Sequence, residues 1–175
     1  FANYSDAAFI LYSPFLVDER INVNHLGIYG TYKFKNKLMI SSKFQYFDLS
    51  DENSGNQLQL RLGKEFESDL SAGYEYFYYD FQNTSPLYWS PVDFESHSLW
   101  ADWILFNDDE VQLSIGGKGG LIPENDYLLS EFYAQFDYLV IKSLFFQARF
   151  STGSSFRSGS GYRSNSISGS LIWNL

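Results

Sequence analysis

Asn165-Ser166-Ile167-Ser168-Gly169-Ser170-Leu171-Ile172-Trp173-Asn174-Leu175 is the stretch that decides the expected fold. From Ile167 onward, every second position is apolar or glycine, whereas serine and asparagine occupy the other phase, with Ile172 the exception. Because side chains alternate across a strand, one face of this strand is apolar and the other polar. About eleven residues at roughly 3.3 Å each are long enough to cross a bilayer when tilted. The stretch therefore predicts a membrane-crossing strand, and the alternative is an edge strand of a soluble β-sandwich.

The position of this stripe carries a resemblance. An apolar stripe that ends at the C-terminal residue resembles the closing strand of bacterial outer-membrane β-barrels, in which the last residue is usually Phe or Trp where this chain has Leu175. The resemblance implies a location in the outer membrane of a Gram-negative bacterium and contact with membrane lipid.

The composition agrees with a barrel. Aromatic residues make up 20% of the 175 residues, yet the mean hydropathy is only -0.25, and no run approaches the roughly 18 apolar residues of a membrane helix. A barrel reconciles these facts because only alternate residues face lipid. The net charge of -9 argues against a nucleic-acid partner. We expect a single barrel domain over residues 1–175, or the C-terminal part of a larger barrel.

The same alternation recurs along the chain and predicts an all-β fold, an antiparallel transmembrane β-barrel of about ten strands. The expected strands are 1–12, 21–34, 38–47, 57–66, 70–81, 96–106, 111–121, 128–139, 144–152 and 165–175. Short turns alternate with longer segments rich in turn residues, such as 48–56, 82–95 and 153–163. Outer-membrane barrels have short periplasmic turns and longer external loops, so we expect the longer segments outside.

Aromatic residues collect near both ends of the predicted strands, where rings with a polar group favour the lipid headgroups. Those expected near the outer rim are Tyr46, Tyr76 and Tyr78, and those near the inner rim are Phe34, Trp103, Phe106 and Trp173.

Charged residues of both signs occupy the polar phase, which would face the barrel lumen. The expected lumen-lining residues are Lys43, Arg61, Glu75, Asp102, Lys118, Glu131, Asp137 and Arg149. Buried charges need partners, and a barrel of about ten strands has a narrow interior. Two interpretations therefore stay open: a cross-braced ionic core that blocks the pore, or the wall of a wetted conduit in a wider barrel.

Catalytic and metal-binding patterns are absent from the sequence. Glu95, Ser96 and His97 are adjacent, but neighbours on a strand point to opposite faces, so they cannot form a Ser-His-acid relay by themselves. Acidic clusters such as 108–110 are typical of solvated turns. We expect no catalytic residue, no metal site and no cofactor.

One further motif carries a resemblance. Tyr88-Trp89-Ser90-Pro91-Val92-Asp93-Phe94 has the pattern Tyr-x-Ser-Pro-x-x-Phe and precedes a predicted strand. It resembles a motif in the C-terminal barrels of tetratricopeptide-repeat outer-membrane proteins that export exopolysaccharide. That resemblance implies passage of a sugar polymer without chemistry, with Tyr88, Trp89, Ser90, Pro91 and Phe94 in an external loop. The alternative is a rigid proline turn with an aromatic anchor at the membrane rim.

The leading hypothesis from the sequence is a non-enzymatic outer-membrane barrel that acts as a pore, or part of one, for polar solutes or polysaccharide. The alternatives are a small closed barrel with a structural or adhesin-like surface role and, less favoured, a barrel lipid hydrolase. Neither the solute nor any partner subunit follows from the sequence.

Overall fold

The computed structural model describes residues 2–8, 21–157 and 160–173. Ten strands make up nearly all of these residues: β1 (Ala2–Ala8), β2 (Asn22–Lys33), β3 (Leu38–Leu49), β4 (Ser54–Glu65), β5 (Leu70–Phe81), β6 (Phe94–Asn107), β7 (Val111–Ile122), β8 (Tyr127–Ile141), β9 (Leu144–Arg157) and β10 (Ser160–Trp173). A short 3-10 helix, η2 (Pro123–Asn125), connects β7 to β8. No helix in the described ranges is long and apolar enough to cross a membrane.

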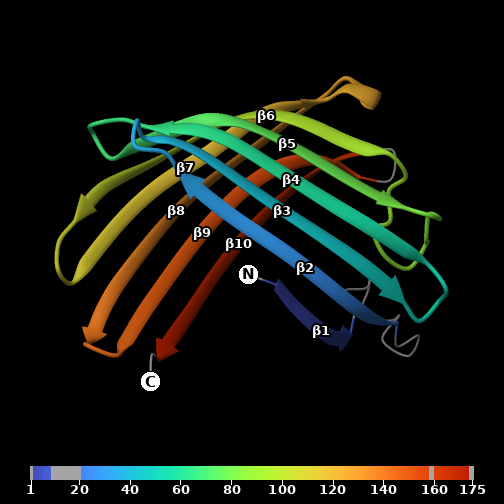
Figure 1. Cartoon of the computed structure of the whole chain (residues 1–175), viewed down its shortest axis with the longest axis horizontal. Helices are drawn as coiled ribbons and strands as arrows, with labels where there is room; N and C mark the ends of the chain where they lie inside the picture. Colours follow the sequence, from blue (N-terminus) through green and yellow to red (C-terminus); the bar gives the residue numbers. More distant parts are fainter. Residues whose placement is uncertain (1, 9–20, 158–159, 174–175) are drawn as a thin grey trace.

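The strands form one sheet in which each strand pairs antiparallel with its neighbours in sequence, from β1 to β10 (Figure 1). This confirms the predicted antiparallel arrangement and the number of strands. Ring closure is not seen, because no ladder joins β1 to β10 among the described residues. In this part of the chain, β1 pairs only with the first half of β2 and β10 pairs only with β9, so the sheet has two open edges.

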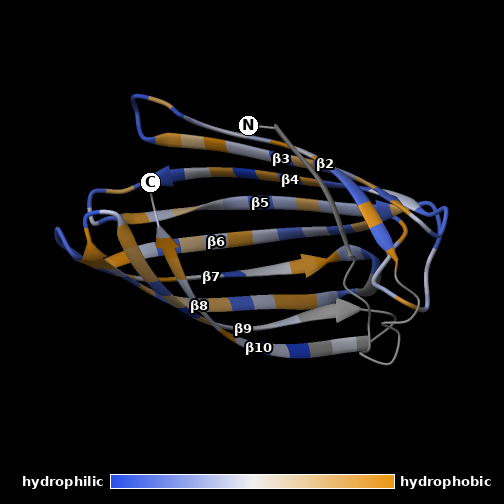
Figure 2. Cartoon of the chain, turned by 90° about the horizontal axis from the view of Figure 1, so that it is seen from below, coloured by the Kyte–Doolittle hydropathy of each residue, from blue (hydrophilic) through white to orange (hydrophobic). Residues whose placement is uncertain are grey.

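The sheet is strongly curved, so that it has a concave and a convex face (Figure 2). Alternation assigns the residues of each strand to these faces. On β6, Ser98 and Trp100 are buried on the concave side, whereas Leu99 between them is 71% exposed. Large apolar side chains stay exposed on the convex side of most strands, among them Leu26, Ile40, Leu60, Leu62, Phe132, Ile167 and Leu171. An apolar outer face over a polar inner face is the arrangement of a β-sheet that contacts lipid.

Leu60 and Gln59 test whether the convex face contacts lipid, because they are neighbours at the middle of β4 and lie on opposite faces. We expect Leu60→Arg to lower the free energy of unfolding by about 2–4 kcal/mol, the cost of a cation at the bilayer midplane. Gln59→Arg should cost much less, since its side chain lies on the polar face beside Glu75. Urea titration of the protein in lipid vesicles measures both, and equal costs would contradict a lipid-facing convex side.

The connections differ in part from the expected alternation of short and long. Segments 34–37, 66–69, 108–110 and 142–143 lie at one end of the sheet, called here the turn end. Segments 50–53, 82–93 and 123–126 lie at the other, the loop end, and among them 82–93 alone is long. The predicted loops 48–56 and 153–163 are too long: β3 and β4 pair up to Asp48 and Ser54, and Arg163 pairs with Ser154. Ladder hydrogen bonds with neighbouring strands override the turn-forming tendency of these serines and glycines.

The first predicted strand also differs in extent. Residues 1–12 were expected, whereas β1 covers Ala2–Ala8. Residue 1 and residues 9–12 lie outside the described residues.

Local hydrogen bonds explain how the turn end forms. In the β2–β3 turn, the Lys37 N–H donates to the Phe34 carbonyl at 3.0 Å, and Lys37 takes a left-handed conformation with φ of 65°. Asp69 takes the same conformation between β4 and β5, with φ of 55°. In the β6–β7 turn, the Asp108 carboxylate accepts hydrogen bonds from the backbone N–H groups of Val111 and Glu110, and these hold the pKa of Asp108 below its usual range.

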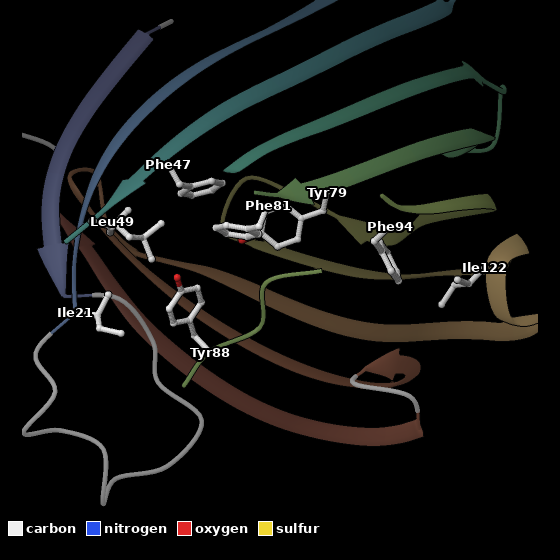
Figure 3. Packing of buried hydrophobic residues seen from close by; sticks show 9 residues of the cluster. Ile21, Phe47, Leu49, Tyr79, Phe81, Tyr88, Phe94 and Ile122 are labelled. Carbon is white, nitrogen blue, oxygen red and sulfur yellow. The ribbon is translucent and has the colours of Figure 1, made fainter. Parts of the chain in front are cut away.

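The buried apolar side chains gather on the concave side at the loop end. This cluster consists of Ile21, Val23, Phe47, Leu49, Tyr79, Phe81, Tyr88, Phe94 and Ile122. Figure 3 shows these rings and aliphatic groups pointing into the space that the curved sheet encloses. Phe81 is 1% exposed and its ring centroid lies 5.0 Å from that of Tyr79 and 6.0 Å from that of Tyr88. The loop end is therefore packed with apolar side chains, whereas the middle of the concave face is polar.

Candidate functional site

Glu75 is the centre of a network of charges in the middle of the concave face. It lies on β5 and is 3% exposed. Its Oε1 is 2.8 Å from Nζ of Lys118, and its Oε2 is 3.4 Å from Nε of Arg61. Gln59 Nε2 donates to the same Oε2 at 2.8 Å. Two cations and an amide donor thus stabilise the negative charge of this buried carboxylate, which would be costly to bury without partners.

Asp102 and Asp137 extend this network along the face. Asp102 Oδ2 lies 3.3 Å from Nη2 of Arg61, and Asp102 Oδ1 accepts a hydrogen bond of 2.8 Å from the Tyr133 hydroxyl. The Asp137 carboxylate accepts hydrogen bonds from Nε2 of Gln135 and Nε2 of Gln147. A phenol–carboxylate hydrogen bond thus links β6 to β8 across β7, and an amide–carboxylate hydrogen bond links β8 to β9.

Two arginines of this face stack on aromatic rings. The Arg61 guanidinium carbon lies 4.0 Å from the centroid of Trp100, and that of Arg149 lies 3.9 Å from the centroid of Tyr133. Both distances are within cation–π range. Gly63 makes room for Trp100, because a Cβ on Gly63 would come within 2.4 Å of the indole ring.

The predicted lumen residues all lie in the concave phase of their strands, although not all belong to the network. Arg61, Glu75, Asp102, Lys118 and Glu131 form one connected set of ion pairs, with Glu131 Oε2 3.6 Å from Nζ of Lys118. Arg149 donates to Oε1 of Gln135, which links it to Asp137. Lys43 is exposed and forms no ion pair with any residue in the described ranges. Their role as a channel lining is a proposal made below.

The segment 82–93 folds inward across the loop end and is fastened there by Tyr88. Tyr88 is fully buried, and its hydroxyl donates to the Asp51 carboxylate, 2.9 Å from Oδ2. Asn53 Nδ2 donates to the same hydroxyl at 2.8 Å, and Oδ1 of Asn53 accepts from the backbone N–H of Asn83. We call Asp51, Asn53 and Tyr88 the latch. Burial raises the pKa of Tyr88 to about 12, so the phenol stays protonated and donates at neutral pH.

This geometry overturns the interpretation of the motif at 88–94 as an aromatic anchor at the membrane rim. Tyr88 and Phe94 belong to the buried cluster on the concave side, and Trp89 packs against that cluster. Ser90 is buried and its hydroxyl accepts a hydrogen bond from the backbone N–H of Ser85. The Pro91 carbonyl accepts from the N–H of Phe81 at 2.8 Å. The motif packs inward because the concave side provides its rings with apolar neighbours and its polar groups with hydrogen-bond partners.

A cavity of about 440 Å³ lies between this segment and the charged network. Its lining includes the rings of Trp89, Phe77 and Phe94 and the polar side chains of Gln57, Gln59 and Ser96. Lys118 and Glu131 connect its floor to the network around Glu75. The cavity crosses the concave face from β4 to β10.

The aromatic residues expected at the two rims lie near the strand ends on the convex face. Towards the turn end, Trp103 is 45% exposed and its Nε1 donates to the Ser68 carbonyl, while Trp173 on β10 is 64% exposed. Towards the loop end, the Tyr78 hydroxyl donates to Asp93.

The adjacent Ser96 and His97 lie on opposite faces, as the alternation predicts. Ser96 is 5% exposed and lines the concave cavity, whereas His97 lies in the convex phase, where its Nδ1 contacts the Tyr74 hydroxyl. They therefore form no relay with each other. In the described ranges, no group of three or more His, Cys, Asp or Glu is arranged to hold a metal ion.

The sequence pattern missed the aromatic and amide members of this site. Trp100 and Tyr133 stack on the arginines, Gln59 binds Glu75, and Asp51 with Asn53 holds Tyr88. An aromatic residue in the polar phase of a strand is a signal that could have identified Trp100 and Tyr133. The latch has no such signal, because Asp51 and Tyr88 meet only through the folding of two separate connections.

Comparisons with known proteins identify the fold and not the family. No protein-family model and no curated protein matches the sequence. The structure is similar to a solved chain described as "Bacterial polysaccharide outer membrane secretin", with a TM-score of 0.75 at 10% sequence identity. The match covers 99% of this chain and 63% of that chain.

This likeness establishes the architecture, a curved antiparallel meander similar to that of an outer-membrane protein. The chain spans 63% of the length of the solved protein that it matches. Its own activity, solute and partners do not follow from the match and belong to the proposal below.

Proposed function

We propose that this chain forms part of an outer-membrane β-barrel channel for polysaccharide or other polar solutes, and that it acts without catalysis. The observation that carries the proposal is the distribution of side chains: an apolar convex face and a concave face with a connected polar network. Lipid outside and water inside explain both faces at once. The structural likeness to a polysaccharide outer-membrane protein supports the same class of function.

The open edges of the sheet support a barrel with more strands than these ten. The concave side of β10 is lined mainly by serine, such as Ser164 and Ser166. An unpaired strand edge in the hydrocarbon region leaves backbone N–H and C=O groups without partners, which is costly in lipid. Further strands between β10 and β1 would satisfy these groups and widen the lumen beyond that of a ten-strand barrel. The chain then belongs to one barrel domain of larger circumference.

Planar-bilayer conductance of the purified full-length protein tests the proposal. We expect discrete ohmic conductance steps, because a wide barrel with a wetted lining conducts ions. A barrel blocked by the ionic network and by the segment 82–93 would give no steps, and that result would favour the alternative of a closed barrel with a structural or surface-interaction role.

A further inference from the structure

The cavity beside Trp89 has the size and lining of a ligand site. Its volume of about 440 Å³ lies within the range of small-molecule sites. Aromatic rings such as those of Trp89 and Phe77 line it together with uncharged hydrogen-bonding groups such as those of Gln57 and Ser96. Apolar surface combined with a few polar groups is the usual composition of a site that orients its ligand.

Trp89 offers the flat surface in this cavity. Its ring centroid lies 5.2 Å from Tyr79 and 5.3 Å from Phe94, with interplanar angles of 60° and 77°. Neither neighbour stacks parallel on the indole, and Trp89 remains half-buried. The C–H groups on one face of a pyranose ring carry a small positive charge that suits the negative face of an aromatic ring. A sugar unit can therefore lie flat against this indole.

The charges around the cavity are already paired within the protein. Lys118 contacts Glu75 at 2.8 Å and Glu131 at 3.6 Å, and Gln59 binds Glu75 as well. A charged ligand buried here would need an unpaired opposite charge, or it would have to break one of these pairs. Amide and hydroxyl groups, in contrast, can both donate to and accept from sugar hydroxyls. The site thus favours an uncharged ligand.

We propose that this cavity is a binding subsite for uncharged pyranose units, in which the sugar stacks on Trp89 and Gln57 forms hydrogen bonds with the sugar hydroxyls. The inference rests on the proposed function, because it assigns the substrate class to the same concave face. Segment 82–93 then supplies the sugar contact at the loop end, in addition to narrowing the opening.

Calorimetric titration of the full-length protein in detergent tests the subsite with defined probes. We expect the neutral glucose hexamers cellohexaose or maltohexaose to bind, and a glucosamine hexamer and a galacturonate hexamer to bind more weakly. Trp89→Ala should weaken binding of the neutral hexamer about tenfold through loss of one aromatic contact. Trp89→Phe, which preserves a ring for the packing against Tyr79 and Phe94, should retain most of the binding.

Two further variants separate binding from folding. Trp173→Ala removes the same side chain from the convex face, where Trp173 is 64% exposed, and should leave sugar binding unchanged. Gln57→Ala removes an amide of β4 that lines the cavity and should weaken binding several-fold. Unchanged affinity in both Trp89→Ala and Gln57→Ala would overturn the assignment.

The channel proposal and the subsite proposal can be refuted independently of each other. A protein that conducts but binds none of the neutral hexamers, or binds a charged hexamer more tightly, refutes the neutral-sugar subsite and leaves the channel proposal in place. A protein that binds the neutral hexamers through Trp89 but never conducts refutes the channel and supports the subsite. Failure of both measurements overturns both proposals.

Discussion

Replacing Glu75 with glutamine is expected to lower the free energy of unfolding by about 3 kcal/mol, the lower end of the cost of breaking a buried ion pair. The amide has nearly the same shape but carries no charge, so Arg61 and Lys118 lose their shared counter-ion. The lower end applies because these two side chains are 33% and 29% exposed, and water screens part of the effect. Urea titration of the protein in lipid vesicles measures the change.

Glu131→Gln is the matched control for this substitution. The Glu131 side chain is 41% exposed and contacts the same Lys118 at the longer distance of 3.6 Å. Surface ion pairs contribute about 0–1 kcal/mol, so its loss should be small. If both variants unfold at the same urea concentration, Glu75 is not the centre of the network.

The predicted alternation is accurate because it rests on a strict geometric rule. On β6, Leu99 and Trp103 were expected on one face and Ser98 and Asp102 on the other, and the structure separates them in this way. Successive side chains of a strand point to opposite faces. A sheet with one apolar and one polar environment therefore needs apolar and polar residues at alternate positions. The order of the strands also follows, since consecutive antiparallel strands joined by short connections pair with each other.

The connections at the loop end were harder to predict because composition does not determine pairing. Serine and glycine residues around 153–163 are typical of loops, yet Ser154 pairs with Ser130 and Arg163. Strand propensity depends on the neighbouring strands, and here β8 and β10 hold the β9 backbone in the ladder. The same limit applies to ring closure, which requires partners that the local pattern of β1 or β10 does not specify.

The sequence predicted on which face the charged residues lie, but not which of them form ion pairs. Alternation places Glu75 and Lys118 on the same side of the sheet, although they are separated by 43 positions and lie on β5 and β7. Their contact depends on the register of β5 with β6 and of β6 with β7, which aligns Glu75 with Ser98 and Ser98 with Gly120. A two-residue shift that aligns Ser98 with Ile122 would keep both side chains inside and move Lys118 farther from Glu75. The register is set by the whole sheet, so the sequence pattern of a single strand does not determine it.

Tyr88→Ala is expected to release segment 82–93 from the loop end. Tyr88 is fully buried and contributes both a ring beside Phe81 and the hydroxyl of the latch. Truncation of a buried aromatic residue costs about 3–5 kcal/mol, and we expect much of this cost as local opening, because the residue belongs to a connection and not to a strand. At about 3 kcal/mol the population of the released segment rises roughly 100-fold. Limited proteolysis within 82–93 measures the release.

Two substitutions in the same region show which part of Tyr88 acts. Tyr88→Phe retains the ring but leaves Asp51 and Asn53 without the hydroxyl that joins them, so proteolysis should rise by a smaller factor, roughly 10-fold for a hydrogen bond to a charged group. Val92→Ala alters a residue of the same segment that is 46% exposed, and its cleavage rate should match that of the unmodified protein. If the protein conducts as proposed, the released segment also leaves the mouth of the channel, so Tyr88→Ala should raise the conductance of each step. Faster proteolysis without a change in conductance would show that segment 82–93 does not limit the opening, and an unchanged cleavage rate would show that the latch does not hold the segment.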